Sequence, residues 1–141
     1  MSEILVHMEG ITKQFPGVMA LNGCRFELRK GEVHALMGEN GAGKSTMMKI
    51  LTGVYQKDEG SITYKGRTVE INHPKTAQDA GISMIHQELN LAPDLTVAQN
   101  IYIGREPRRK LGLFLDEKAL NRQVEALFER MGLVMDPSAL V

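Results

Sequence analysis

Short runs of apolar residues, separated by polar residues and glycines, mark the elements expected in the first half of the chain. Residues 4–9 and 24–29 have strand character, and the second run alternates apolar with polar positions. Residues 61–64 and 68–71 predict another strand pair, joined through Lys65-Gly66-Arg67 as a tight turn. Together these runs predict a small antiparallel β layer.

Two further apolar runs, at residues 33–37 and 82–86, have the short continuous form of strands buried in a parallel sheet. Between them, apolar residues at 47, 48, 50 and 51 fit one face of a helix. Residues 75–80 predict a second, short helix that ends at Gly81. The order strand, loop, helix, strand is typical of α/β nucleotide-binding folds.

Strand signals fade after residue 88, and helical spacing replaces them. Thr96 is placed to cap a short helix that contains Val97 and Ile101. Apolar positions three or four residues apart predict an amphipathic helix over 117–131, with Asp116 as its N-cap and an end near Gly132. We therefore expect an α/β part over residues 1–95 and a helical part over 96–141.

The composition is that of a globular domain, with 141 residues of which 43% are hydrophobic. Seventeen basic and seventeen acidic residues give a formal net charge of zero, so overall charge does not favour binding to nucleic acid. No apolar run approaches the roughly 18 residues that a membrane span needs. Cys24 is the single cysteine, which excludes an intrachain disulfide.

The strongest chemical signal is a match to the phosphate-binding loop pattern G-x-x-x-x-G-K-S/T at every fixed position. The matching residues are Gly38, Glu39, Asn40, Gly41, Ala42, Gly43, Lys44 and Ser45. Glycines let the backbone curl around an anion, and the N–H groups of the loop and of the following helix point inward. An apolar run before the loop and a helix after it favour this interpretation over a glycine-rich turn without a ligand.

Each side chain at the end of the loop has a role in this chemistry. Lys44 brings a positive charge to the β- and γ-phosphates of a nucleoside triphosphate. Ser45 offers a hydroxyl to Mg²⁺, a hard cation that prefers oxygen ligands. Thr46 extends the helix start, and the predicted ligands are ATP and Mg²⁺.

Several families share such a loop, and other residues separate them. GTPases are disfavoured because the guanine-reading Asn-Lys-x-Asp motif is absent from the sequence. Small-molecule kinases carry arginine-rich lids, but here the basic stretch over 105–110 is interrupted by Pro107 and is better interpreted as a solvated loop.

The segment Leu113-Phe114-Leu115-Asp116-Glu117 looks like a second nucleotide motif, in which apolar residues precede a Mg²⁺ ligand and a general base. The apolar stretch is short and helical residues follow it. We therefore predict that Asp116 caps a helix.

Four segments of the chain resemble the ATP-binding subunits of ATP-binding cassette (ABC) transporters, particularly the ribose-type monosaccharide importers. The segment over 86–91 is shared by far fewer proteins than the phosphate loop, and it indicates the sugar-importer branch. The likeness spans nearly the whole chain. The segments are Phe15-Pro16-Gly17-Val18-Met19-Ala20-Leu21, residues 38–46, His86-Gln87-Glu88-Leu89-Asn90-Leu91, and Leu95 to Ile101 with Gly104-Arg105-Glu106-Pro107.

The resemblance implies a P-loop NTPase core of the ABC type, with an N-terminal antiparallel β layer and the start of a helical subdomain. Phe15 matches the aromatic residue that stacks on adenine. Gln87 matches the catalytic glutamine that reaches Mg²⁺ or the attacking water. Residues 88–101 would face the membrane subunits.

The function implied is that of an ABC-type sugar-transporting ATPase, in which ATP hydrolysis drives import of a monosaccharide or related sugar. The implied partners are integral-membrane permease subunits, a second cassette and, indirectly, a sugar-binding protein, at the cytoplasmic face of a bacterial inner membrane. In the family, the signature motif and the catalytic glutamate come after the positions that this chain covers. We therefore expect the 141 residues to be the front of a first cassette, with weak binding and little turnover of their own.

Two alternatives remain at this level. One is a soluble ABC-type ATPase that acts on ribosomes or DNA without a permease, which the neutral charge disfavours. The other is a nucleotide-binding regulatory module without turnover.

Overall fold

The computed structural model describes residues 3–86, 90–109 and 114–141. The chain divides into two compact units, residues 1–85 and 86–141. Among the described residues, no helix combines the length and the hydropathy that crossing a membrane requires.

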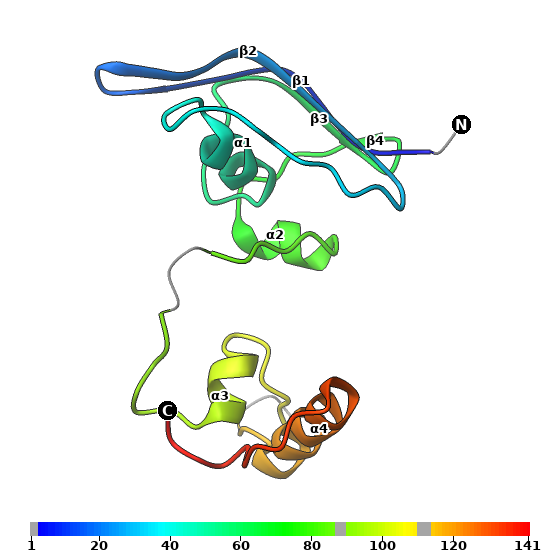
Figure 1. The fold of residues 1–141 in the computed structure, drawn as a ribbon, viewed down its shortest axis with the longest axis vertical. Coiled ribbons are helices and arrows are strands. Elements are labelled where there is room, and N and C mark those ends of the chain that lie inside the picture. Colours follow the sequence, from blue (N-terminus) through cyan, green and yellow to red (C-terminus); the bar gives the residue numbers. More distant parts are fainter. Residues whose placement is uncertain (1–2, 87–89, 110–113) are drawn as a thin grey trace. The chain divides into compact units, whose positions relative to one another are not determined.

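The first unit is built on a four-stranded antiparallel sheet in the order β2-β1-β3-β4. Its strands are β1 (Ile4–Phe15), β2 (Val18–Arg29), β3 (Glu59–Tyr64) and β4 (Arg67–Thr68). Figure 1 shows α1 (Lys44–Leu51) and α2 (Pro74–Asp79) on the same side of this sheet. The antiparallel layer predicted from the sequence is confirmed.

The first two strands are twice as long as predicted, with twelve residues each. The alternation along them is interrupted where the register shifts between Met8 and Lys13 of β1. Gly10 (φ 63°) and Gly23 (φ 58°) lie in this irregular part and have backbone angles that other residues rarely adopt. Bulges of this kind break the two-residue period, so the pattern marks only part of each strand.

The turn between β3 and β4 has two residues instead of the predicted three. Lys65 (φ 50°) and Gly66 (φ 74°) both have positive φ, as the tight turns of hairpins require. The predicted strand over 68–71 is wrong beyond Thr68, although Val69 N still donates to Ile62 O at 2.9 Å.

The strands predicted over residues 33–37 and 82–86 are also absent, and this corrects the prediction for both segments. Val33 is 99% exposed and Ile85 is 95% exposed. A run of apolar residues forms a strand only where a neighbour supplies backbone hydrogen bonds, and no described strand pairs with either segment. The apolar composition of these two segments indicated a tendency to be buried, but composition does not show whether a neighbouring strand is present.

The core of the first unit lies between the sheet and its helices. Met8, Ile11 and Ile62 from the strands are almost fully buried, and so is Ile50 from α1. The buried hydrophobic residues that form this core are Val6, Met8, Ile11, Leu21, Phe26, Met47, Ile50, Leu51, Ile62, Ile71 and Ala77. The helical face predicted after the phosphate loop is confirmed, because Met47, Ile50 and Leu51 all join this core.

The second unit is helical and has its own small core. It contains α3 (Val97–Tyr102) and α4 (Glu117–Met131), whose buried residues are Ala98, Leu120, Val124 and Phe128. The cap predicted at Thr96 and the helix end predicted near Gly132 are both confirmed. Thr96 Oγ1 accepts a hydrogen bond from Gln99 N at 3.2 Å, and α4 ends at Gly132 with φ 67°.

Candidate functional site

The phosphate-loop residues form a loop that closes on the side chain of Lys44. Lys44 Nζ donates hydrogen bonds to the carbonyl oxygens of Gly38, at 2.5 Å, and Glu39, at 2.7 Å. Within the loop, Ala42 N donates to Glu39 O at 3.2 Å, which makes a turn. The ammonium group is therefore held at the mouth of the loop, and one of its three N–H donors is left for a ligand.

Gly43 joins this loop to α1 and has a left-handed backbone, with φ 81°. A Cβ atom at this position would lie 2.6 Å from Ala20 O and 2.6 Å from Leu21 Cδ2. Glycine is thus required twice, by the backbone angle and by the close approach to β2. The contact fixes the start of α1 against the sheet.

The start of α1 is suited to an anion. The first N–H groups of a helix have no partner within the helix, and they carry a partial positive charge. Gly43 provides no capping side chain, and the first turn contains no acidic residue. Ser45 is exposed in that turn, and Thr46 is half-buried.

The remaining loop residues, Glu39, Asn40, Gly41 and Ala42, are exposed. An exposed, glycine-rich loop that leads into a helix N-terminus is the arrangement that binds phosphate groups in other proteins. The described residues thus fit a triphosphate with its Mg²⁺, because they offer an ammonium group, the backbone N–H groups of a helix start and the Ser45 hydroxyl.

Phe15 is the last residue of β1 and is half-buried. Its ring meets the ring of Tyr55 at a centroid distance of 5.2 Å and an interplanar angle of 70°, which is an edge-to-face contact. Lys13 Nζ lies 5.6 Å from the Phe15 centroid. Phe15 pairs with Val18 across the hairpin, on the strand whose Ala20 and Leu21 contact the phosphate loop.

Gln87 lies outside the described residues, so its predicted role stays a prediction. Its described neighbour His86 is in irregular backbone and not in the strand that the sequence predicted.

The carboxylates at residues 116 and 117 belong to a helix start. Asp116 Oδ1 accepts a hydrogen bond from Ala119 N at 3.1 Å, and its Oδ2 lies 3.6 Å from Arg109 Nε. Phe114 is 72% exposed, which a buried motif strand does not permit. The prediction that Asp116 caps a helix is confirmed, and no group of three or more acidic, His or Cys side chains in the described part of the chain is placed to hold a metal.

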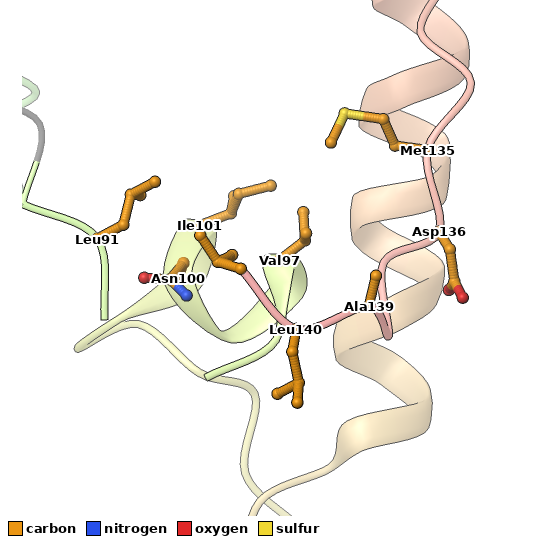
Figure 2. Close-up of a pocket in the computed structure, with 9 residues that line it drawn as sticks. Leu91, Val97, Asn100, Ile101, Met135, Asp136, Ala139 and Leu140 are labelled. Atoms are coloured by element: carbon orange, nitrogen blue, oxygen red, sulfur yellow. The ribbon is translucent and has the colours of Figure 1, made fainter. Parts of the chain in front are cut away.

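The second unit has an open, mostly apolar groove of about 430 Å³ beside α3. Figure 2 shows side chains from α3 and from the C-terminal segment around it. Leu91 is 56% exposed and Leu140 is 70% exposed at this groove. Its lining residues are Leu91, Val97, Asn100, Ile101, Met135, Asp136, Ala139, Leu140 and Val141.

Asn100, the polar residue of α3 at this groove, has a structural task. Its Oδ1 accepts from Ala92 N at 2.8 Å, while Nδ2 donates to the carbonyl oxygens of Ala92, at 3.0 Å, and Leu95, at 3.2 Å. The side chain therefore holds the irregular segment 92–96 against α3.

Two residues beside Phe15 were not found from the sequence. Tyr55 contacts the Phe15 ring from 40 positions along the chain, and Asp58 binds the backbone of β1 at Gln14 with an N to Oδ2 distance of 2.7 Å. A contact between residues so far apart leaves no mark in local periodicity. The one sequence signal that could have indicated Tyr55 is its place soon after Gly53, the glycine at the end of a helix.

Comparison with known proteins identifies the family. The family model described as "ABC transporter" matches residues 21–141. A putative ribose/galactose/methyl galactoside import ATP-binding protein of Burkholderia ambifaria is 64% identical over 137 residues, which are 97% of this chain and 27% of that protein. A protein of the same description from Albidiferax ferrireducens is 55% identical over 97% of this chain and 27% of its own length. The chain thus spans about a quarter of the length of these curated relatives.

Solved structures agree on the fold. A nucleotide-free ATP-binding cassette from an ABC transporter matches with a TM-score of 0.78 and 25% identity, over 97% of this chain and 57% of that one. An ATP-binding cassette of an ABC transporter in its ADP conformation matches with a TM-score of 0.76 and 24% identity, over 99% and 58% of the two chains. The fold class predicted from the sequence, a P-loop NTPase core of the ABC type, is confirmed.

Proposed function

The chain belongs to the ABC transporter family, and on this premise we propose that it is the nucleotide-binding front part of an ATPase that drives sugar import. The observation that carries the proposal is the loop closed around Lys44 at the start of α1. The described residues offer donors for phosphate oxygens on one short stretch of backbone. Residues 1–95 then form part of the catalytic core, and residues 96–141 begin the helical subdomain.

Different residues of the site contact different parts of the ATP molecule. The backbone of residues 38–46 and the Lys44 ammonium hold the β- and γ-phosphates of ATP. Phe15 offers the face of its ring to the adenine, a contact worth about 1–3 kcal/mol in base stacking. Affinity for the base therefore resides in the β1–β2 hairpin, whereas affinity for the triphosphate resides in the loop.

The Ser45 hydroxyl and the side chain of Gln87 would hold Mg²⁺, which would supply positive charge to neutralise charge on the phosphates. Gln87 would also orient the attacking water. Hydrolysis at a useful rate would require, in addition, a second cassette that completes the phosphate site with opposing charges.

The names of the relatives support a role in transport. Their names describe import of ribose, galactose or methyl galactoside, which supports a monosaccharide as the cargo of the whole protein. The protein would act at the cytoplasmic face of the bacterial inner membrane, bound to permease subunits that receive sugar from a binding protein. The apolar groove beside α3, with Leu91 and Ile101 in its lining, gives these subunits a surface to contact.

The direct test uses the whole protein with its permease in sealed membrane vesicles. ATP-dependent uptake of radiolabelled ribose or galactose is expected for the wild type, and Lys44→Ala should abolish it while the complex still assembles. If the protein instead co-purified with RNA or DNA in a salt-sensitive manner and without membrane proteins, a soluble cassette acting on nucleic acid would replace this proposal.

A further inference from the structure

The segment that follows α1 turns back toward the end of β1. Gly53, with φ 73°, reverses the chain just beyond the helix. Val54 N and Tyr55 N then both donate to Lys49 O, at 2.8 Å and 3.0 Å. These two hydrogen bonds fix the backbone of Tyr55 to the last turn of α1.

The ring of Tyr55 lies against side chains from both β1 and α1. Its edge-to-face contact with Phe15 lies on one side, and Lys49 Nζ lies 5.2 Å from the Tyr55 centroid. Tyr55 is half-buried and packs against the core of the first unit. The Phe15 ring therefore rests on a neighbour that has little freedom to move.

Asp58, three residues further on, holds the backbone of β1 immediately before Phe15. Its carboxylate accepts hydrogen bonds from Lys13 Nζ at 2.6 Å and from Gln14 N at 2.7 Å. In addition, Asp58 N donates to Thr12 O at 2.9 Å. The connection from α1 to β3 is thus hydrogen-bonded to three successive residues near the end of β1.

We propose that Tyr55 is a positioning residue for the nucleotide base, because it holds the Phe15 ring in the orientation that stacks on adenine. The inference rests on the function proposed above and names a residue to which that function assigned no role. The single helix α1 begins at the phosphate loop, and its last turn holds the backbone of Tyr55, so one element supports both the loop and the residue that contacts Phe15. A ring fixed before binding loses less rotamer freedom when the base arrives.

A purely structural role for Tyr55 predicts something different. If Tyr55 only filled space in the core, its loss would loosen the helix and the loop together and would weaken every ligand of the loop equally. A positioning role predicts a loss confined to ligands that carry a base. Inorganic tripolyphosphate has the phosphates of ATP without the base, so it separates the two roles.

The experiment measures the affinity of the chain for Mg-ATP and for Mg-tripolyphosphate by calorimetric titration, in the wild type and in three variants. Tyr55→Leu should weaken Mg-ATP by roughly 3- to 10-fold, the loss expected for one aromatic pair, and should leave Mg-tripolyphosphate unchanged. Tyr55→Phe keeps the ring and should retain wild-type affinity for both. Tyr64→Leu is the matched control, because Tyr64 Oη donates to Ala80 O at 3.1 Å and Tyr64 is not part of the Phe15 contact.

The possible results are distinct. Equal weakening of both ligands by Tyr55→Leu, or no change in either, would overturn the positioning role while leaving the proposed function intact. Weakening of Mg-ATP by Tyr64→Leu to the same extent would do so as well. A folded wild-type chain that bound neither ligand would overturn the proposed function itself, and this inference with it.

Discussion

Replacement of Gly43 by alanine tests whether the phosphate loop is built against β2 as described. The left-handed backbone at this residue costs a non-glycine residue about 1–2 kcal/mol. The new Cβ would also lie 2.6 Å from Ala20 O, where ordinary contact begins at 3.4 Å, so backbone must move. Overpacking of this kind costs about 1–3 kcal/mol, which brings the expected destabilisation to roughly 2–5 kcal/mol.

Gly41→Ala supplies the matched control. Gly41 has φ 89°, but a Cβ there meets nothing within 4 Å, so only the conformational cost of about 1–2 kcal/mol applies. Both variants are compared by urea unfolding followed by tyrosine fluorescence. A Tyr102→Phe background leaves Tyr55 and Tyr64 as the fluorescent residues, and both lie in the first unit. If Gly43→Ala were no more destabilising than Gly41→Ala, the close contact between the loop and β2 would be refuted.

Two further predictions concern carboxylates. The hydrogen bond from Lys13 Nζ, with a second from Gln14 N, lowers the pKa of Asp58 below its ordinary value of 3.8. The ionised Asp58 carboxylate therefore stabilises the fold above about pH 4, and this stabilisation is lost as the pH falls through the folded-state pKa. The urea midpoint of the wild type should exceed that of Asp58→Asn at pH 7 and approach it as the pH is lowered below about 4, and a difference that did not change with pH would contradict the pairing. Asp116→Ala should destabilise α4 by about 1 kcal/mol, measured by thermal unfolding in circular dichroism, through loss of the cap on Ala119 N. The same variant should keep its Mg-ATP affinity, whereas a magnesium-binding carboxylate would not.

The sequence predicted best where local chemistry decides the structure. The bounds of α4 follow from apolar spacing together with Asp116 at one end and Gly132 at the other, and the structure has both caps. The helix after Gly43 was equally predictable, since the glycine, the lysine and the apolar face all act within one turn or two. These signals involve hydrogen bonds and packing between near neighbours.

Prediction failed where a partner distant in sequence decides the structure. Residues 33–37 are apolar enough for a buried strand, but a strand forms only with a hydrogen-bonded neighbour. In the same way, Phe15 was singled out through the resemblance to ABC cassettes, whereas its partner Tyr55, 40 positions away, was not. The role of Gln87 remains a prediction, because that residue lies outside the described part of the chain.

The most direct measurement of the central claim is calorimetric titration of the 141-residue chain with Mg-ATP, next to a Lys44→Ala variant shown by circular dichroism to be folded. Lys44 Nζ closes the loop on the carbonyl oxygens of Gly38 and Glu39 and supplies the charge for the phosphates. The account predicts weak but saturable binding by the wild type and none by the variant. Equal binding by both chains, or no binding by a folded wild type, would contradict the claim that this loop is a nucleotide site.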